Sequence, residues 1–187
     1  MDAWKNLKVL GVGGDDSNHA GDSKGEIIVA TFSSLNEDTI VRNFPNSRDY
    51  QKTTKWLDSP YRDFRFTMLM AEQYRHSSQN LVDILPLLIN SYINESNLEL
   101  RKLKIYLDGR LERGGRDVFR RHFSDKCGIE NIVVDNFIKK NKNKKGHTAK
   151  RPHCPELVYH ADVLANMLYS NMTFEELSQH KKFAPLR

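Results

Sequence analysis

The sequence has few cysteines and no long apolar run. Cys127 and Cys154 are its two cysteines, and they do not form a CxxC pair. Two cysteines are too few for a disulfide framework. No run of eighteen apolar residues occurs, which argues against a membrane-spanning helix. The stretch MDAWKNLKVL also lacks the basic and long apolar regions of a secretory signal. We therefore expect a cytoplasmic protein in a reducing setting, with no membrane partner.

The composition otherwise matches that of an ordinary globular protein. Hydrophobic residues make up 39% of the 187 residues and charged residues 28%, which is enough apolar material for a substantial core. Apart from one lysine-rich stretch, the sequence has no internal repeat, linker or low-complexity segment. We predict that residues 1–187 form a single domain.

Positive charge is concentrated in one stretch, Lys139–Arg151 (KKNKNKKGHTAKR), called the basic stretch below. It has seven Lys or Arg residues and no acidic residue; subtracting them from the net charge of +5 leaves −2 for the rest of the chain. A focused positive charge predicts a nucleic-acid partner, RNA, DNA or a hybrid. The alternative is a solvated loop that serves solubility. The predicted nucleic-acid contacts are Lys139, Lys140, Lys142, Lys144, Lys145, Lys150 and Arg151.

Two hydrophobic periods predict the secondary structure. Runs rich in β-branched and aromatic residues, or alternating in polarity, predict five strands: Lys8–Gly14, Gly25–Ser33, Asp63–Ala71, Leu103–Leu107 and Ile132–Val134. Helical spacing predicts helices over Leu81–Ile93, Gly115–Lys126 and Pro155–Ser170, and a short last helix capped by Thr173 and Glu176. Pro86 predicts a kink or a later helix start. Glu37–Phe44 is expected to be extended, and Pro45–Pro60 a loop with one helical turn at most.

The resulting order is β-β-β-α-β-α-β-α. Three antiparallel strands followed by βαβα units predict an α/β fold with a five-stranded mixed sheet and helices on both faces.

Acidic residues stand where the predicted strands end. In Lys8–Gly21 (KVLGVGGDDSNHAG), an apolar run and two glycines are followed by Asp15 and Asp16. Two adjacent negative charges at a strand end raise the electrostatic energy unless they share a cation. The alternative interpretation is a solvated Asp-Asp turn.

Two further aspartates extend this pattern. Asp108 directly follows the strand residues Ile105–Leu107, and Asp162 lies on the last long helix, in PELVYHADVLANMLYS. If the first and fourth strands are neighbours and this helix packs over their ends, all four carboxylates converge. Such a cluster stays ionised only with divalent cations between its members. Two cations about 4 Å apart activate water and stabilise the leaving oxygen in phosphodiester cleavage. We therefore predict that Asp15, Asp16, Asp108 and Asp162 are metal ligands and catalytic residues, with two Mg²⁺ or Mn²⁺ ions.

The element order and these acidic positions resemble the ribonuclease H-like superfamily. GVGGDDSNHAG resembles the GxDEAGRG opening of ribonuclease HII, and IYLDGR resembles its strand-four aspartate segment. HADVLANML resembles the final-helix aspartate segment of RuvC-type resolvases. The resemblance implies that Asp15 bridges two metals, that Asp16 replaces a glutamate, and that Asp108 and Asp162 are the third and fourth ligands.

The sequence departs from ribonuclease HII in two ways. Asp16 is one methylene shorter than the glutamate, and Ser17–Gly21 replaces the second half of the AGRG element. The turn that reads the RNA 2′-hydroxyl therefore cannot be carried over, and the resemblance implies a nuclease-like fold without naming the substrate.

Several other residues compete for roles in the site. Asp135 could replace Asp162 as the last ligand, and His19 could contact a phosphate, as could Arg110, Arg113 and Arg116. Glu72 and Asp83 are alternative carboxylates, which we expect to face solvent. His160 lies two residues before Asp162, which points it to the other side of the helix and favours a structural role. His153 and Cys154 are a weak zinc signal because no second ligand pair accompanies them.

The favoured hypothesis is a divalent-metal-dependent nuclease that works by a two-metal mechanism. One alternative is a non-catalytic nucleic-acid-binding module of the same fold. Another is phosphoryl transfer with Asp15 as the nucleophile. That chemistry usually needs a helix N-terminus or glycine-rich loop around the phosphate, whereas here the first strand turns into the second.

Overall fold

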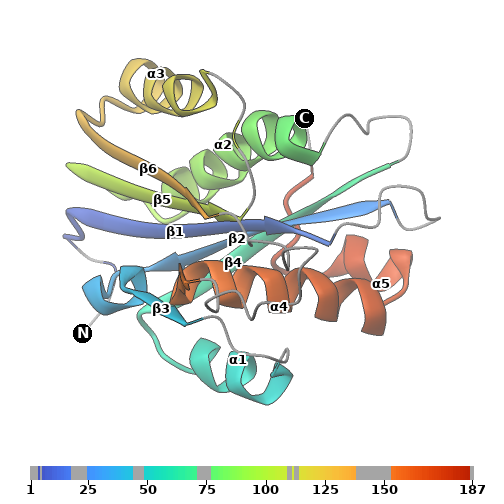
Figure 1. Ribbon diagram of the computed structural model, residues 1–187. Helices are drawn as coiled ribbons and strands as arrows, with labels where there is room; N and C mark the ends of the chain where they lie inside the picture. Colours follow the sequence, from blue (N-terminus) through green and yellow to red (C-terminus); the bar gives the residue numbers. More distant parts are fainter. Residues whose placement is uncertain are drawn as a thin grey trace, which may run out of the picture.

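Five strands form one mixed sheet in the order β4-β2-β1-β5-β6 (Figure 1). The computed structural model describes residues 4, 6–17, 25–43, 49–70, 77–108, 111, 114–137 and 153–185. The strands are β1 (Val9–Asp16), β2 (Glu26–Ser33), β4 (Arg62–Leu69), β5 (Lys102–Asp108) and β6 (Asn131–Phe137). β1 pairs antiparallel with β2, which pairs antiparallel with β4, while β1–β5 and β5–β6 are parallel.

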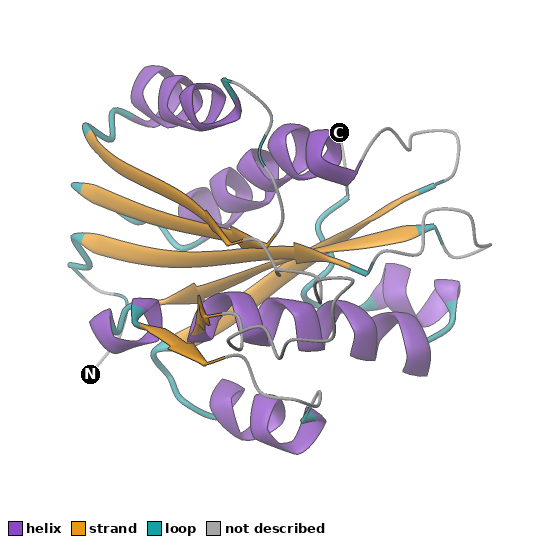
Figure 2. Ribbon diagram, viewed as in Figure 1, coloured by secondary structure: helices purple, strands orange, loops and turns teal. Residues whose placement is uncertain are grey.

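Helices cover both faces of this sheet (Figure 2). α2 (Ser77–Glu95) and α3 (Gly115–Cys127) lie on one face, called the α2 face below; α1 (Tyr50–Leu57), α4 (Glu156–Asn171) and α5 (Phe174–Gln179) lie on the other, the α4 face. A 3₁₀ turn, η1 (Asn36–Thr39), and a two-stranded pair, β3 (Val41–Asn43) with β7 (His153–Pro155), stand beside α4. The predicted α/β fold, with a five-stranded mixed sheet and helices on both faces, is confirmed.

Strand alternation assigns each β1 side chain to a face. Leu10 and Val12 belong to the core cluster that contains residues of α2 and α3, so even-numbered β1 positions face α2. Odd-numbered positions face α4, as the close approach of Gly13 to Leu157 shows. β2 is buried at every position because both of its faces are covered, which explains its continuous apolar run.

Two apolar cores result, one on each side of the sheet. The core on the α2 face includes Phe32, Leu85 and Phe119, and the core on the α4 face includes Val29, Phe66 and Leu164. α4 is buried around most of its circumference, from Leu157 to Asn166. None of the helices in the described ranges is both long and apolar enough to cross a membrane.

The structure differs from the sequence-based prediction in several elements. β1 continues through both of its aspartates to Asp16, and β6 includes Asp135 instead of ending before it. α2 begins at Ser77 and holds Pro86 inside it, so the later helix start is wrong.

The segment predicted as a loop contains the eight-residue helix α1. Its N-cap Asp49 accepts a hydrogen bond from the Lys52 amide at 2.9 Å, and its residues Thr53 and Trp56 are buried. A helix this short depends on tertiary packing, which local sequence does not reveal.

Candidate active site

Asp15, the last residue but one of β1, and Asp108, the last residue of β5, lie on the same face of neighbouring parallel strands. The register pairs Gly13 with Tyr106 and Gly14 with Leu107, so Asp15 and Asp108 follow at the next step. Leu107 packs in the core on the α2 face, so alternation places Tyr106 and Asp108 on the α4 face, together with Asp15.

Asp162 approaches the same region from α4, which runs in the same general direction as β1 (Figure 1). Near its start, Leu157 touches Gly13, and Val158 packs in one cluster with Tyr106. Asp162 comes one helical turn, about 6 Å, after Val158. Asp108 comes two strand residues, about 6–7 Å, after Tyr106. The two carboxylates therefore lie at the same level along the sheet.

Asp15 reaches this level as well, because it is two residues beyond Gly13. It is 3% exposed and Asp162 is 2% exposed. Two carboxylates so deeply buried need compensating charge or hydrogen bonds, since a buried charge without them is expensive. The fold thus brings Asp15, Asp108 and Asp162 to one end of the α4 face.

Asp16 is not brought together with these three residues. Its register partner is Ile28, which packs in the core on the α2 face, and the β1–β2 pairing runs without a bulge to this point. Strict alternation therefore directs the Asp16 side chain to the α2 face. Its backbone amide, by contrast, donates to Oδ1 of Asp15 at 2.9 Å and so helps to orient that carboxylate. The strand register thus argues against the expectation that all four carboxylates converge.

Glu26 is a further buried carboxylate, and it is not among the residues predicted for the site. It lies on the α2 face, diagonally across from Asp16, and is fully buried. The sequence feature that could have indicated Glu26 is its position as a charged residue at the start of the largely apolar strand Glu26–Ser33.

Asp135 lies on the α4 face but does not reach the level of Asp108. It pairs in register with Tyr106, so it is two residues below the level of Asp108 along the sheet. Burial raises the pKa of Tyr106, and the charge of Asp135 adds to that rise. Asp135 therefore borders the carboxylates from the edge strand.

Carboxylate oxygens are the ligands that Mg²⁺ and Mn²⁺ prefer, so the donor set at this end of the sheet fits these ions. Within the described ranges, no three His, Cys, Asp or Glu side chains form a group that could hold a metal ion. The chemistry of the three aspartates therefore suits these ions, but the described side chains do not themselves form a metal-binding group.

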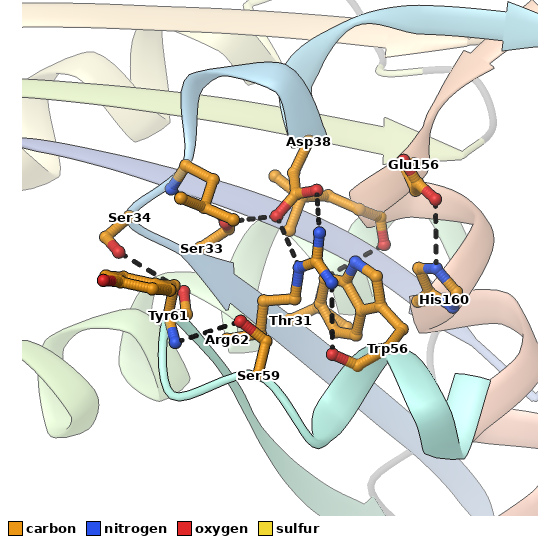
Figure 3. Close-up of polar contacts among 12 residues, drawn as sticks. Thr31, Ser33, Ser34, Asp38, Trp56, Ser59, Tyr61, Arg62, Glu156 and His160 are labelled. Carbon is orange, nitrogen blue, oxygen red and sulfur yellow. Dashed lines mark hydrogen bonds and ion pairs between the residues drawn. The ribbon is translucent and has the colours of Figure 1, made fainter. Parts of the chain in front are cut away.

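His160 has a structural environment on the other side of α4 (Figure 3). Its ring stacks on Trp56 with ring centroids 4.3 Å apart, its Nδ1 is hydrogen-bonded to Thr53 Oγ1 at 2.9 Å, and its Nε2 lies 3.7 Å from Glu156 Oε1. Burial lowers the pKa of His160, which keeps the ring neutral. This agrees with the expected structural role.

A buried ion pair holds the same region together (Figure 3). Arg62 donates to both carboxylate oxygens of Asp38, from Nε at 2.9 Å and from Nη2 at 3.0 Å, and Ser33 Oγ donates to Asp38 as well. The Arg62 guanidinium also lies over the Trp56 ring. These contacts join η1 and α1 to the sheet.

The remaining candidates have separate surroundings. Cys154 is buried in the apolar cluster of Tyr106, Val158, Tyr159 and Val163, and Asp83 is exposed on α2. Arg116 donates to Asn136 Oδ1 at 2.7 Å, near the end of β6. Lys139, Lys140, Lys142, Lys144, Lys145, Lys150 and Arg151 lie outside the described residues, as do His19, Glu72, Arg110 and Arg113.

Comparison with known proteins adds a distant structural likeness. No protein-family model matches the chain, and no curated protein matches it either. Among solved structures, the chain is similar to one from the PCNA:RNase HII complex of Archaeoglobus fulgidus, with 12% sequence identity and a TM-score of 0.47. The match covers 95% of this chain and 82% of that one. A likeness of this degree says nothing about chemistry, so the function has to be argued from the residues of this chain.

Proposed function

We propose that this protein is a divalent-metal-dependent nuclease that hydrolyses phosphodiester bonds, with Asp15, Asp108 and Asp162 as its metal ligands. The proposal is supported by the strand register and the contacts of α4 with the sheet, from which we infer that Asp15 of β1, Asp108 of β5 and Asp162 of α4 lie at one level on the α4 face. β1, β5 and α4 are far apart in sequence, and each contributes one carboxylate, which is an oxygen ligand.

Each of the three residues has a distinct part in this proposal. Asp15 is held by the Asp16 amide, which leaves its carboxylate fixed on the central strand. Asp162 is buried on α4, and Asp108 is partly exposed at the end of β5. Bound Mg²⁺ or Mn²⁺ ions would supply the positive charge that activates water and stabilises the leaving oxygen.

The basic stretch completes the proposal because three carboxylates alone would repel a phosphate backbone. It ends at Arg151, directly before β7 and α4, so the chain connects it to the helix that carries Asp162. We propose that its lysines hold the nucleic-acid backbone. RNA, DNA and a hybrid all satisfy such contacts, since phosphate contacts position a strand without reading its bases.

The test is a cleavage assay with single-stranded, duplex, hybrid and branched substrates, in Mg²⁺ or Mn²⁺, for the natural protein and for Asp15→Asn. Metal-dependent cleavage that disappears in the variant supports the proposal and names the substrate class. Salt-sensitive binding by both proteins without any cleavage would instead support a non-catalytic nucleic-acid-binding module. Cleavage that persists in Asp15→Asn would remove Asp15 from the site.

A further inference from the structure

α4 touches the sheet backbone at a point formed by Gly13, Thr31 and Leu157 and called the anchor contact below. A Cβ placed on Gly13 would lie 2.4 Å from the carbonyl carbon of Leu157, so the two backbones meet here with no side chain between them. The Thr31 hydroxyl donates to the Leu157 carbonyl oxygen at 2.9 Å and lies 3.3 Å from the Gly13 carbonyl oxygen. Thr31 is fully buried and is the register partner of Gly13.

The anchor contact precedes Asp15 along β1 and Asp162 along α4 by similar distances. Asp15 follows Gly13 by two strand residues, about 6–7 Å. Asp162 follows Leu157 by five helical residues, about 7–8 Å. A slide or tilt of α4 at the anchor contact would therefore change the height of Asp162 relative to Asp15.

We propose that Thr31 is a positioning residue: its hydroxyl sets the height of α4 on β1 and thereby the distance between Asp162 and Asp15. This inference rests on the proposed function, because that distance matters only if the two carboxylates share a ligand. Thr31 itself touches no substrate and no reacting atom.

The Thr31 hydroxyl is suited to this role because the core-facing α4 residues that come after Leu157 contact the sheet through apolar side chains. Ala161, Leu164, Ala165 and Leu168 lie in the core on the α4 face. Dispersion contacts of this kind have no preferred direction, whereas a hydrogen bond weakens steeply when its geometry changes. Leu157 would keep its helical hydrogen bond without Thr31, so removing the hydroxyl frees α4 to shift without leaving that carbonyl oxygen unsatisfied.

The chain offers a matched control in Thr67. Thr67 is also a fully buried strand threonine, but it lies on β4, and its hydroxyl has no hydrogen-bond partner among the described residues. Its register partner Ile28 packs on the α2 face, so Thr67 faces away from α4. Replacement by valine makes the same change of side chain at both positions and removes a helix-to-sheet hydrogen bond at only one of them.

The experiment measures Mn²⁺ binding by calorimetry, without nucleic acid, for the natural protein, Thr31→Val, Thr31→Ser and Thr67→Val. We expect Mn²⁺ to bind about 10-fold more weakly to Thr31→Val, the size of effect seen when a group that orients a metal ligand is removed. Thr31→Ser, which keeps the hydroxyl, should bind as the natural protein does, and so should Thr67→Val. In the cleavage assay, Thr31→Val should lower kcat and leave KM unchanged.

The outcomes separate this inference from the proposed function. If the natural protein cleaves and Thr31→Val binds Mn²⁺ as Thr67→Val does, the role of Thr31 is overturned and the nuclease stands. If Thr31→Ser loses as much affinity as Thr31→Val, packing of the side chain is responsible and the hydroxyl role is overturned, even if Thr31→Val folds poorly. If the natural protein neither binds Mn²⁺ nor cleaves, the proposed function fails and this inference fails with it.

Discussion

Gly13 of β1 and Leu157 of α4 are in backbone contact: a Cβ on Gly13 would lie 2.4 Å from the Leu157 carbonyl carbon and 2.5 Å from its oxygen. This contact lets α4 lie directly against the central strand, so that Asp162 can stand beside Asp15. Gly13, the second glycine of the GVGG run, is thus needed for α4 to pack against β1.

Gly13→Ala should lower the free energy of unfolding by about 2–3 kcal/mol, because the added methyl group meets backbone atoms that cannot move without displacing α4. Gly115→Ala is the matched control, since its Cβ would find ordinary contacts of 3.4 Å or more. We expect the control to stay within about 1 kcal/mol of the natural protein. Urea denaturation of both variants measures the difference, and equal stabilities would contradict the close contact.

Asp15→Asn, Asp108→Asn and Asp162→Asn should each reduce metal-dependent cleavage by more than about 100-fold, because each removes a proposed ligand, and ligands matter more than the groups that orient them. Without metal, each should also raise the melting temperature, because carboxylate repulsion is relieved.

Asp16→Asn is the internal comparison, since its side chain faces α2 and its backbone amide is retained. We expect this variant to lose much less activity than Asp15→Asn. A loss as large as that of Asp15→Asn would show that the Asp16 side chain bends around the strand end and joins the ligands.

The protein should lose stability as the pH falls below about 6.5, the ordinary pKa of histidine. Burial lowers the pKa of His160, so below pH 6.5 the unfolded chain binds more protons than the folded one, and the free energy of unfolding decreases. Glu156 opposes this effect, while Lys52 and Arg62 add to it. Burial lowers the pKa of His122 and His180 in the same direction.

Melting temperatures measured from pH 7.5 to 5.5 test this effect in the natural protein and in His160→Asn. The variant should show a shallower decline with falling pH, whatever its stability at neutral pH. Identical slopes would mean that His160 does not contribute to the acid sensitivity.

Asp38→Asn should destabilise the protein by about 3 kcal/mol, because it leaves the Arg62 guanidinium without the buried charge that two of its nitrogens contact. Asp117→Asn tests an exposed ion pair for comparison, with Arg120 at 3.4 Å, and should change stability by less than about 1 kcal/mol. Chemical denaturation of both variants provides the measurement. Similar small effects would indicate that the Asp38–Arg62 pair is well solvated.

Replacing Lys142, Lys144 and Lys145 by glutamine should weaken nucleic-acid binding and make its salt dependence less steep, by roughly one unit for each phosphate that is no longer neutralised. Lys126→Gln, at an exposed position on α3, is the control and should leave both quantities unchanged. Fluorescence anisotropy over a salt series measures them. An unchanged affinity and slope in the triple variant would make the basic stretch a solvated loop.

Local sequence patterns determined most of the strands and helices of this protein. Alternating and β-branched runs predicted the five strands of the sheet, and helical spacing predicted α2, α3 and α4, because side-chain periodicity reports which residues face a core. The Asp15 and Asp108 positions followed from the strand ends, and the Thr173–Glu176 capping box was confirmed in α5. These features depend on residues a few positions apart.

Only the tertiary structure decided which side chains meet. Asp16 was expected beside Asp15, but strand pairing carried β1 on through both residues and turned Asp16 to the α2 face, because successive side chains of a continuing strand point to opposite faces. α1 was missed because its stability comes from burying Trp56 against His160, a residue more than a hundred positions away. The level shared by Asp15 and Asp162 depends on the contact of Gly13 with Leu157, and no local pattern encodes a contact between segments so distant in the chain.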